Sequence, residues 1–236
     1  MSMLDLFDVE AGYGAGQVLF GVSLSIAAGS CISLMGRNGM GKTTTVRAIM
    51  GQLPLTAGRI SRFGDDRPAR TSFDIARDGI GLVPEGRQIF TNLTVRENLL
   101  TFFRAPESHT GSSWNFDRVL DLFPRLTERL DHAGNQLSGG EQQMLAIGRA
   151  LMTNPKLLIL DEATEGLAPI IRDQIWTCLK LLKQDGQSIL IIDKNVDAIA
   201  KLADHNYILD KGRVVWHGDS DALLNEADLK SRYLGV

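Results

Sequence analysis

The 236-residue sequence predicts an α/β fold in one domain, a mainly parallel sheet with a helical insertion. Three observations support this prediction. An apolar run at 31–35 enters a glycine-rich loop and then a helical segment. Apolar runs at 157–161 and 188–192 flank a helical pattern at 170–184, which is the order of a βαβ unit with parallel strands. The stretch between about 94 and about 151 is helical in pattern.

The first part of the chain is predicted to form short strands. Residues 3–35 include segments in which polar and apolar side chains alternate, as in half-buried strands. The glycine-rich loop that follows opens a helix over 42–50, which Gly51 ends. Further short strands are expected at 58–61 and 80–83.

The helical stretch carries its own start and stop signals. Thr94 and Glu97 have the spacing of a capping box, which marks a helix start. A loop is expected at 110–113. After it, one helical face is apolar, and Pro124 is expected to end that helix. This face consists of Phe116, Val119, Leu120 and Phe123.

The strand pattern returns towards the C-terminus. A strand is expected at 207–209, and a hairpin-like turn at 211–212 leads into another strand at 213–216. No repeat, low-complexity tract or linker divides the chain. The expected division of the single domain 1–236 is a core over 1–85 and 152–236 and a helical subdomain over 86–151.

Composition narrows the class of protein. Apolar residues make up 44%, which is ordinary for a globular chain, and the net charge of −3 gives no reason to expect nucleic-acid binding. Cys31 and Cys178 form no metal or disulfide pattern, so buried free thiols in a reducing compartment are expected. No signal peptide is recognised at the N-terminus, and no apolar run approaches the ~20 residues that span a bilayer.

The glycine-rich loop has the spacing of a phosphate-binding loop. Its glycines let the backbone N–H groups close around phosphate, and the helix that follows directs its positive end at the anion. Lys42 can reach the β- and γ-phosphates, and the Thr43 hydroxyl can bind Mg²⁺. The alternative is a plain glycine-rich turn. The candidate nucleotide-binding residues are Gly36, Arg37, Asn38, Gly39, Met40, Gly41, Lys42, Thr43 and Thr44.

Two acids follow the apolar run at 157–160. Because Asp161 ends a buried strand, its carboxylate is expected at the carboxyl edge of the sheet, where open α/β sheets bind ligands. Asp161 is suited to hold Mg²⁺, and Glu162 is placed to polarise an attacking water molecule. The alternative is a pair of solvated acids at the end of a strand.

A third motif lies between these two. Ser138 and Glu141 match a capping box, so Ser138-Gly139-Gly140-Glu141 is at least an ordinary helix start. Two glycines in a first helical turn cost roughly 1 kcal/mol each relative to alanine. Glycine is suitable there if the bare backbone approaches another group, and an anion would be stabilised by the helix end.

In this order the three motifs resemble those of the ATP-binding-cassette (ABC) ATPases. The resemblance implies a P-loop NTPase core with a mixed or parallel sheet, a small antiparallel β subdomain and an inserted helical subdomain. It implies ATP and Mg²⁺ as cofactors. It also implies that Ser138 to Glu141 touch the γ-phosphate bound to a second ATPase subunit, and that Tyr13, ahead of the first strands, stacks on adenine. The alternative for Tyr13 is packing at the end of a strand.

The chain departs from this family at three positions. Glu85 stands where a glutamine usually senses Mg²⁺ and the γ-phosphate, Lys194 replaces a histidine that contacts the γ-phosphate, and Ala168 replaces an aspartate that crosses the dimer. Glu85 and Lys194 are retained as candidate catalytic residues beside Lys42 and Glu162, and Glu85 also as a metal ligand. The Lys194 cation could offset Glu85 or bind the γ-phosphate. Alternatively, it extends into solvent.

Two of these departures, Glu85 and Ala168, lie in segments that point to one subfamily of the ABC ATPases. Val83 to Arg87 and Glu165 to Pro169 look like the LivF-type ATPases of bacterial branched-chain amino-acid importers, although urea-importer ATPases share much of the pattern. This implies a second ATPase subunit, identical or different, two membrane permease subunits and, indirectly, an extracytoplasmic solute-binding protein. The expected location is peripheral, at the cytoplasmic face of the bacterial inner membrane.

The sequence leaves open how closure of the dimer would reach the membrane subunits. It also leaves two rival functions open. Closure of the dimer would be relayed through Ile89, Phe90 and Leu93, unless these form only a small core patch. A cytosolic ABC ATPase that moves nothing is a rival class, although no coiled-coil insertion, second cassette or basic groove supports it. A nucleotide-gated binding module is disfavoured by the presence of Glu162.

Overall fold

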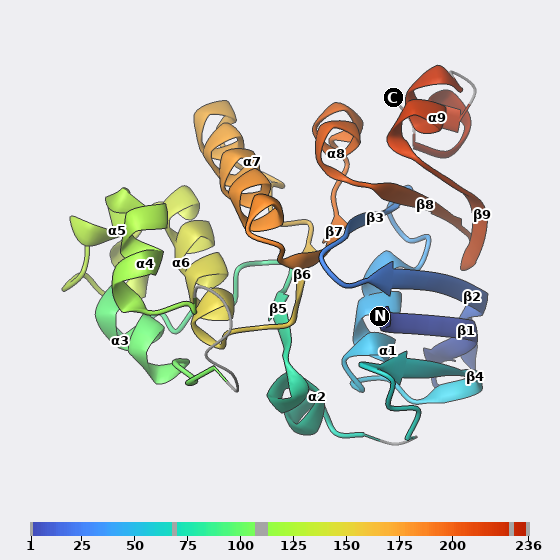
Figure 1. The fold of residues 1–236 in the computed structure, drawn as a ribbon, viewed down its shortest axis with the longest axis horizontal. Coiled ribbons are helices and arrows are strands. Elements are labelled where there is room, and N and C mark those ends of the chain that lie inside the picture. Colours follow the sequence, from blue (N-terminus) through green and yellow to red (C-terminus); the bar gives the residue numbers. More distant parts are fainter. Residues whose placement is uncertain (1, 68–69, 107–112, 227–228, 235–236) are drawn as a thin grey trace.

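The structure is a computed structural model that describes residues 2–67, 70–106, 113–226 and 229–234. A six-stranded sheet occupies the middle of the molecule, a three-stranded sheet lies at one end, and helices α3 to α6 lie at the other (Figure 1). Only Ser113 of the loop expected at 110–113 falls within the described residues. The division of the chain at 86 and 151 stays a prediction.

The central sheet is mixed, as predicted. Its order is β5-β6-β7-β3-β8-β9, in which β9 alone runs antiparallel to its neighbour. The predicted hairpin at 211–212 therefore joins β8 to β9. The strands are β3 (Cys31–Met35), β5 (Ile80–Val83), β6 (Leu157–Asp161), β7 (Ser188–Ile192), β8 (His205–Asp210) and β9 (Arg213–Gly218).

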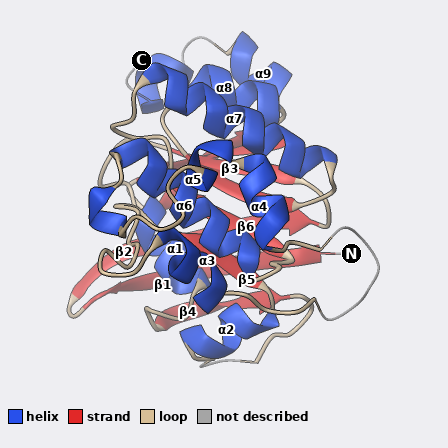
Figure 2. Ribbon diagram, turned by 90° about the vertical axis from the view of Figure 1, so that its left-hand side faces the viewer, coloured by secondary structure: helices blue, strands red, loops and turns tan. Residues whose placement is uncertain are grey.

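The inner strands β6 and β7 are almost entirely apolar because both faces of the sheet are covered. Leu158 and Leu160 of β6 belong to the core shared with the long helices and the helical end of the molecule. Leu157 and Ile159 point to the opposite core, which contains the first helix and the three-stranded sheet. Figure 2 shows α7 and α8 covering one face of the strands.

The three-stranded sheet is antiparallel, with the order β2-β1-β4. Its strands are β1 (Ser2–Tyr13), β2 (Gly16–Ala27) and β4 (Leu55–Arg62). The prediction of short strands was wrong here, because β1 and β2 each run for 12 residues with several register shifts. Tyr13 does not precede the first strands. It ends β1, at the hairpin that leads into β2.

The helices begin and end largely where the sequence signals them. Both predicted capping boxes, Thr94 with Glu97 and Ser138 with Glu141, are formed. Pro124 ends α4 as expected, but it also occupies the first turn of a further short helix. The helices are α1 (Lys42–Ile49), α2 (Ser72–Asp78), α3 (Val95–Thr101), α4 (Phe116–Leu122), α5 (Pro124–Thr127), α6 (Gly139–Met152), α7 (Pro169–Gln184), α8 (Val196–Leu202) and α9 (Ser220–Asn225), with helical turns at Gly134–Gln136 and Lys230–Leu234.

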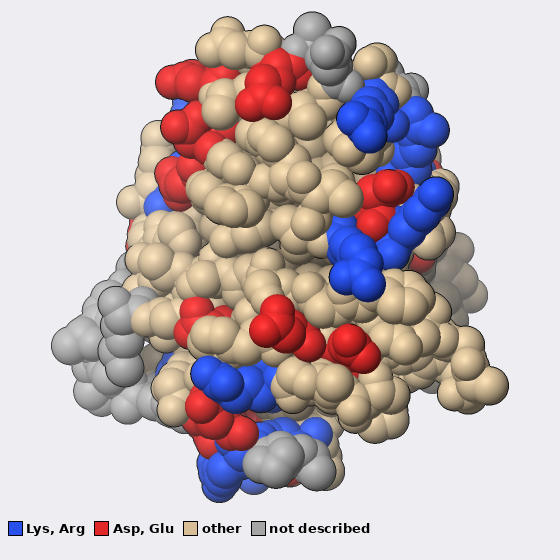
Figure 3. Space-filling model, turned by 90° about the vertical axis from the view of Figure 1, so that its right-hand side faces the viewer, with Lys and Arg blue, Asp and Glu red and all other residues tan. Residues whose placement is uncertain are grey.

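Surface charge agrees with the mild net charge. On the end of the molecule seen in Figure 3, Lys and Arg gather at the upper right edge and at the bottom, and Asp and Glu lie mainly at the upper left and across the middle. Within the described residues, no helix is both long enough and apolar enough to cross a membrane.

The two cysteines are buried free thiols, as predicted. Burial raises the pKa of both Cys31 and Cys178 to about 12. Because the thiolate is the reactive form, the native chain is expected to resist a thiol-specific reagent at pH 8, and both thiols should react after unfolding in guanidinium chloride. Mass spectrometry of the labelled chain measures this, and rapid labelling of the folded protein would contradict the burial of these side chains.

Candidate functional site

The predicted phosphate loop joins β3 to α1 at the carboxyl edge of the parallel strands. Gly36 has a φ of 145°, and a Cβ at this position would lie 2.2 Å from the carbonyl oxygen of Leu209. A side chain is therefore excluded where the loop leaves the strand. The loop is supported from the β8–β9 hairpin, because the Gly212 N–H donates to the Met40 carbonyl at 3.0 Å. The Gly212 carbonyl in turn accepts from the Phe20 N–H of β2 at 2.9 Å.

Lys42 is buried, with 4% of its surface exposed, and its charge is held inside the loop. The Nζ atom donates to the carbonyl oxygens of Gly36 at 2.9 Å and Arg37 at 3.1 Å. It also lies 3.4 Å from Oε1 of Glu162. The ammonium group is thus fixed between the phosphate loop and one of the two predicted acids.

Asp161 ends β6 and is only 2% exposed. Burial raises the pKa of its carboxyl, a hydrogen bond with the Thr43 hydroxyl lowers it, and the charge of Glu85 raises it. The Oδ1 atom has no hydrogen-bond partner among the described residues. A buried carboxylate oxygen without a donor suits a metal ion or its bound water, so Thr43 and Asp161 fit the predicted Mg²⁺ site.

Glu85 is exposed and has no ion-pair partner among the described residues. It acts on Asp161 through its charge, which places it close to the candidate metal ligands. Within the described chain, no group of three His, Cys, Asp or Glu side chains could hold a metal by itself. A cation here would depend on the Thr43 hydroxyl, on water and on phosphate oxygens as well.

Glu162 follows directly, in a left-handed conformation with a φ of 52°. Its N–H donates to the Ile192 carbonyl at 2.8 Å, so the strained residue is held by the neighbouring strand. Burial, followed by a hydrogen bond with Glu165, raises the pKa of Glu162 to about 7, although the charges of Lys42 and Lys194 oppose this. A carboxyl with such a pKa can accept a proton near neutral pH, which suits a general base.

Lys194 forms contacts that the sequence did not predict, and its binding of the γ-phosphate stays a prediction. Its Nζ donates to Glu165 Oε1 at 2.6 Å and lies 3.9 Å from Glu162 Oε2. Lys194 thus pairs with Glu165, and the described residues show no ion pair between Lys194 and Glu85. The side chain is partly exposed but does not simply extend into solvent. The hydrogen bond that Lys194 donates to Glu165 raises the pKa of Lys194, which stays charged.

The Ser138 segment begins α6 and lies apart from this cluster. The Ser138 N–H donates to Glu141 Oε2 at 2.7 Å, which completes the capping box. A Cβ on Gly139 would lie 2.9 Å from the Arg87 guanidinium, and one on Gly140 would lie 2.9 Å from the Ile171 side chain. Packing within this chain therefore accounts for part of the need for glycine. None of these neighbours belongs to the phosphate loop.

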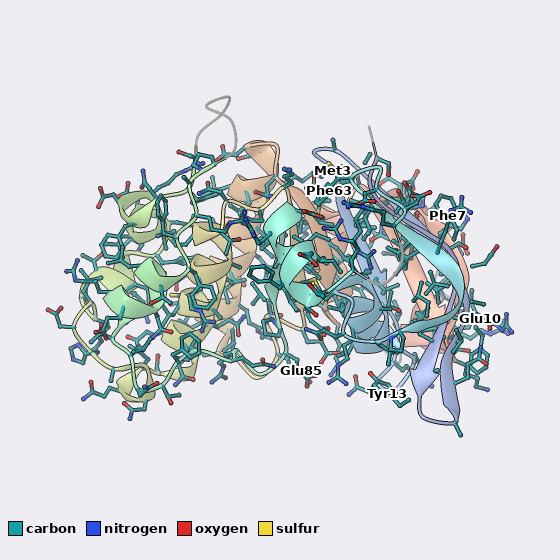
Figure 4. The ribbon with its side chains drawn as sticks, turned by 90° about the horizontal axis from the view of Figure 1, so that it is seen from below. Met3, Phe7, Glu10, Tyr13, Phe63 and Glu85 are labelled. Carbon is teal, nitrogen blue, oxygen red and sulfur yellow. The ribbon has the colours of Figure 1, made fainter. Side chains whose placement is uncertain are left out.

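Tyr13 is 44% exposed, and its hydroxyl accepts from Arg47 Nη1 at 3.1 Å. Figure 4 shows Tyr13 and Glu85 along the same edge of the molecule. Arg47 and Glu85 line one cavity together, and Arg47 also acts on Asp161 through its charge. The ring of Tyr13 is thus available near the loop rather than packed into a core, although no contact in the structure tests its stacking on adenine.

The apolar residues after Glu85 differ in burial, and their role in relaying closure of the dimer stays a prediction. Ile89 is half-buried and packs against the core, whereas Phe90 is 43% exposed and stacks on Phe102 with ring centroids 5.8 Å apart. Beside them lies a cavity of about 730 Å³. Its lining includes Phe73, Phe102, Phe103, Arg87 and Arg149.

Sequence reasoning missed three contributors to the site. Arg47 fixes Tyr13, Arg87 covers Gly139 and donates to Gln142 Oε1 at 3.2 Å, and Glu165 holds Lys194. Arg87 and Glu165 stand inside motifs that the sequence singled out. Their partners are 55 and 29 residues away, so no local pattern could identify the contacts.

Comparisons with known proteins agree with this geometry. Residues 19–165 match the family described as "ABC transporter". The high-affinity branched-chain amino acid transport ATP-binding protein BraG of Pseudomonas aeruginosa is 42% identical over 235 residues, which cover 99% of this chain and 100% of BraG. Nod factor export ATP-binding protein I of Rhizobium meliloti is 38% identical over 94% of this chain and 66% of its own length.

A solved structure has the same fold. It is the dimeric, post-hydrolysis state of an ATP-binding cassette bound to ADP and phosphate, with a TM-score of 0.79 and 26% identity. The match covers 92% of this chain and 99% of that one. The motifs, the convergence of Lys42, Asp161 and Glu162, and these matches over most of the sequence lead to one assignment. The chain belongs to the ABC transporter family and is an ATP-hydrolysing cassette of that family.

Proposed function

We propose that this chain is the ATPase subunit of an importer for branched-chain or other hydrophobic amino acids. The observation that carries the proposal is the meeting of Lys42, Asp161 and Glu162 at one edge of the sheet, with Lys42 Nζ 3.4 Å from Glu162 Oε1. Lys42 and the N–H groups of the phosphate loop bind the ATP phosphates. Glu162 orients and deprotonates the attacking water molecule.

Mg²⁺ completes this proposed site. The Thr43 hydroxyl and the Asp161 Oδ1 atom would hold the ion, directly or through water, and Glu85 lines the same cavity as these two residues. When bound, the ion neutralises charge on the phosphates. Asp161 then keeps one buried carboxylate oxygen available for the ion, since no described residue forms a hydrogen bond with that oxygen.

The nucleotide lies between two cassettes in this proposal. Ser138 and the glycines after it contact Glu141, Arg87 and Ile171 within their own chain, so the exposed start of α6 remains for a phosphate held by a second subunit. The dimeric cassette with ADP and phosphate supports this arrangement, since it shares the fold over 92% of this chain. The second subunit is another copy or a related ATPase.

The membrane subunits bind at the cavity of about 730 Å³ between the helical end and the central sheet. The exposed rings of Phe73 and Phe103 at its rim supply apolar surface, and Glu85 and Asp161 line the same cavity. A segment bound here would therefore contact both the helical end and the metal-site residues. The cargo follows from BraG, whose whole length matches this chain. The ATPase works at the cytoplasmic face of the membrane.

The catalytic assignment predicts the effect of Glu162→Gln. The amide keeps the shape but cannot accept the proton, so ATP turnover should fall by roughly a hundredfold or more while ATP is still bound. Steady-state hydrolysis and equilibrium binding of ATP measure the two effects. Glu128→Gln, which changes an exposed acid at the end of α5, is the matched control and should hydrolyse ATP like the wild type. Normal turnover by Glu162→Gln would refute the assignment.

The docking assignment predicts the effect of charges at the cavity rim. Phe73→Asp and Phe103→Asp should reduce co-purification with the permease subunits, because a carboxylate opposes burial of an apolar segment. ATP binding by the isolated chain should not change. Phe7→Asp is the control, since Phe7 is also exposed but stacks on Arg59 in the three-stranded sheet. Equal loss of the permease subunits from all three variants would contradict the docking site.

The cargo is tested by uptake. Deletion of the gene for this chain should reduce accumulation of radiolabelled leucine, isoleucine and valine by intact cells, and the wild-type gene should restore it. Uptake of labelled urea in the same strains is the comparison. Loss of urea uptake with normal leucine uptake would overturn the proposed cargo while leaving the ATPase assignment in place.

A further inference from the structure

Two contacts join the loop after β6 to the loop after β7. The Thr164 hydroxyl donates to Asp193 Oδ2 at 2.5 Å, and both side chains are buried. One residue further along each loop, Lys194 Nζ donates to Glu165 Oε1 at 2.6 Å. The two loops are therefore joined by consecutive contacts, one buried and one at the surface. Asp193 Oδ1 also accepts from the Asn195 N–H at 3.0 Å, which fixes the backbone around Lys194.

These contacts direct Lys194 towards the catalytic cluster. Its Nζ lies 3.9 Å from Glu162 Oε2, while Lys42 Nζ lies 3.4 Å from the other oxygen, Oε1. The two ammonium groups thus face the two oxygens of one carboxylate. Lys194, Glu162 and Glu165 line a cavity of about 290 Å³ together with Arg172. Lys194 therefore faces a hollow beside the catalytic acid.

A lysine side chain this exposed would not keep such a place unaided. It has four rotatable bonds, and a single exposed ion pair is too weak to hold a long side chain in one geometry. Here the buried Thr164–Asp193 bond fixes the loops from which both partners extend, so the conformational cost of the Lys194–Glu165 pair is reduced. Without Glu165, the nearest carboxylate for Lys194 would be Glu162 itself.

We infer that Glu165 is a positioning residue, which holds the Lys194 ammonium group towards the terminal phosphate of ATP and limits its pairing with the Glu162 carboxylate to the 3.9 Å contact. The inference rests on the proposed ATP site at Lys42 and Glu162. Glu165 has no direct contact with ATP in this scheme. Its effect on nucleotide affinity acts through Lys194, so its removal should affect ligands that carry a third phosphate rather than those with two. Its hydrogen bond with Glu162 bears on turnover instead.

A double-mutant cycle on the purified full-length chain tests this. Affinities for AMP-PNP and for ADP are measured by equilibrium titration for the wild type, Glu165→Ala, Lys194→Ala and the double variant, with kcat and KM for ATP alongside. Each single variant should lose roughly tenfold in AMP-PNP affinity relative to ADP, the scale of one hydrogen bond to a charged group. In the Lys194→Ala background, Glu165→Ala should add no further loss.

Controls separate this from general damage and from failure of the ATP site. Asp185→Asn removes a second 2.6 Å ion pair, with Arg118, which is not part of the proposed site, and should leave both affinities unchanged. Melting temperatures report folding. Additive losses, or equal losses for ADP and AMP-PNP, would overturn the role of Glu165. If the wild type binds nucleotide and Lys42→Ala does not, the proposed ATP site is supported, whatever the result of the double-mutant cycle for Glu165.

Discussion

The pairing of three parallel strands is the constraint on which the site depends. Strands β6, β7 and β3 lie side by side, and neighbouring strands are separated by only about 4.8 Å. The phosphate loop follows β3, the two acids follow β6, and Lys194 follows β7. Because parallel strands end at the same edge, residues far apart in sequence meet there without any dedicated connection. The register that pairs Asp161 with Ile192 also places the Glu162 N–H against the Ile192 carbonyl.

The charges at this edge are arranged in alternation. Lys42, Glu162, Lys194 and Glu165 follow one another. Burial rather than the neighbouring cations decides the protonation of Glu162, since its pKa lies well above the ordinary value. A buried carboxylate whose charge is only partly balanced by neighbouring cations costs free energy in the folded state. Such a cost is common where a group must react, because a fully paired carboxylate would be a poor base.

Features with a local signal could be predicted from the sequence. The strands at 80–83, 157–161 and 188–192, the phosphate loop and both capping boxes have such signals, and the structure has them at those positions. Helices α2, α8 and α9 span only six or seven residues, too few to display a helical period, and were not predicted. The place of Tyr13 and the partner of Lys194 depend on which distant segments the fold brings together. Local sequence patterns do not contain this information, so neither could be predicted.

The β8–β9 hairpin extends the set of residues on which nucleotide binding depends. Gly212 connects the phosphate loop to β2 through its N–H and its carbonyl, has a φ of 72°, and would bring a Cβ within 1.8 Å of the Val18 carbonyl oxygen. A side chain at this position would push the β8–β9 hairpin away from β2, at the point where the hairpin forms its hydrogen bond with Met40. Gly212 is far from the catalytic residues in sequence and has no reactive group. A natural variant that changes it should nevertheless be interpreted as a change that damages the catalytic site.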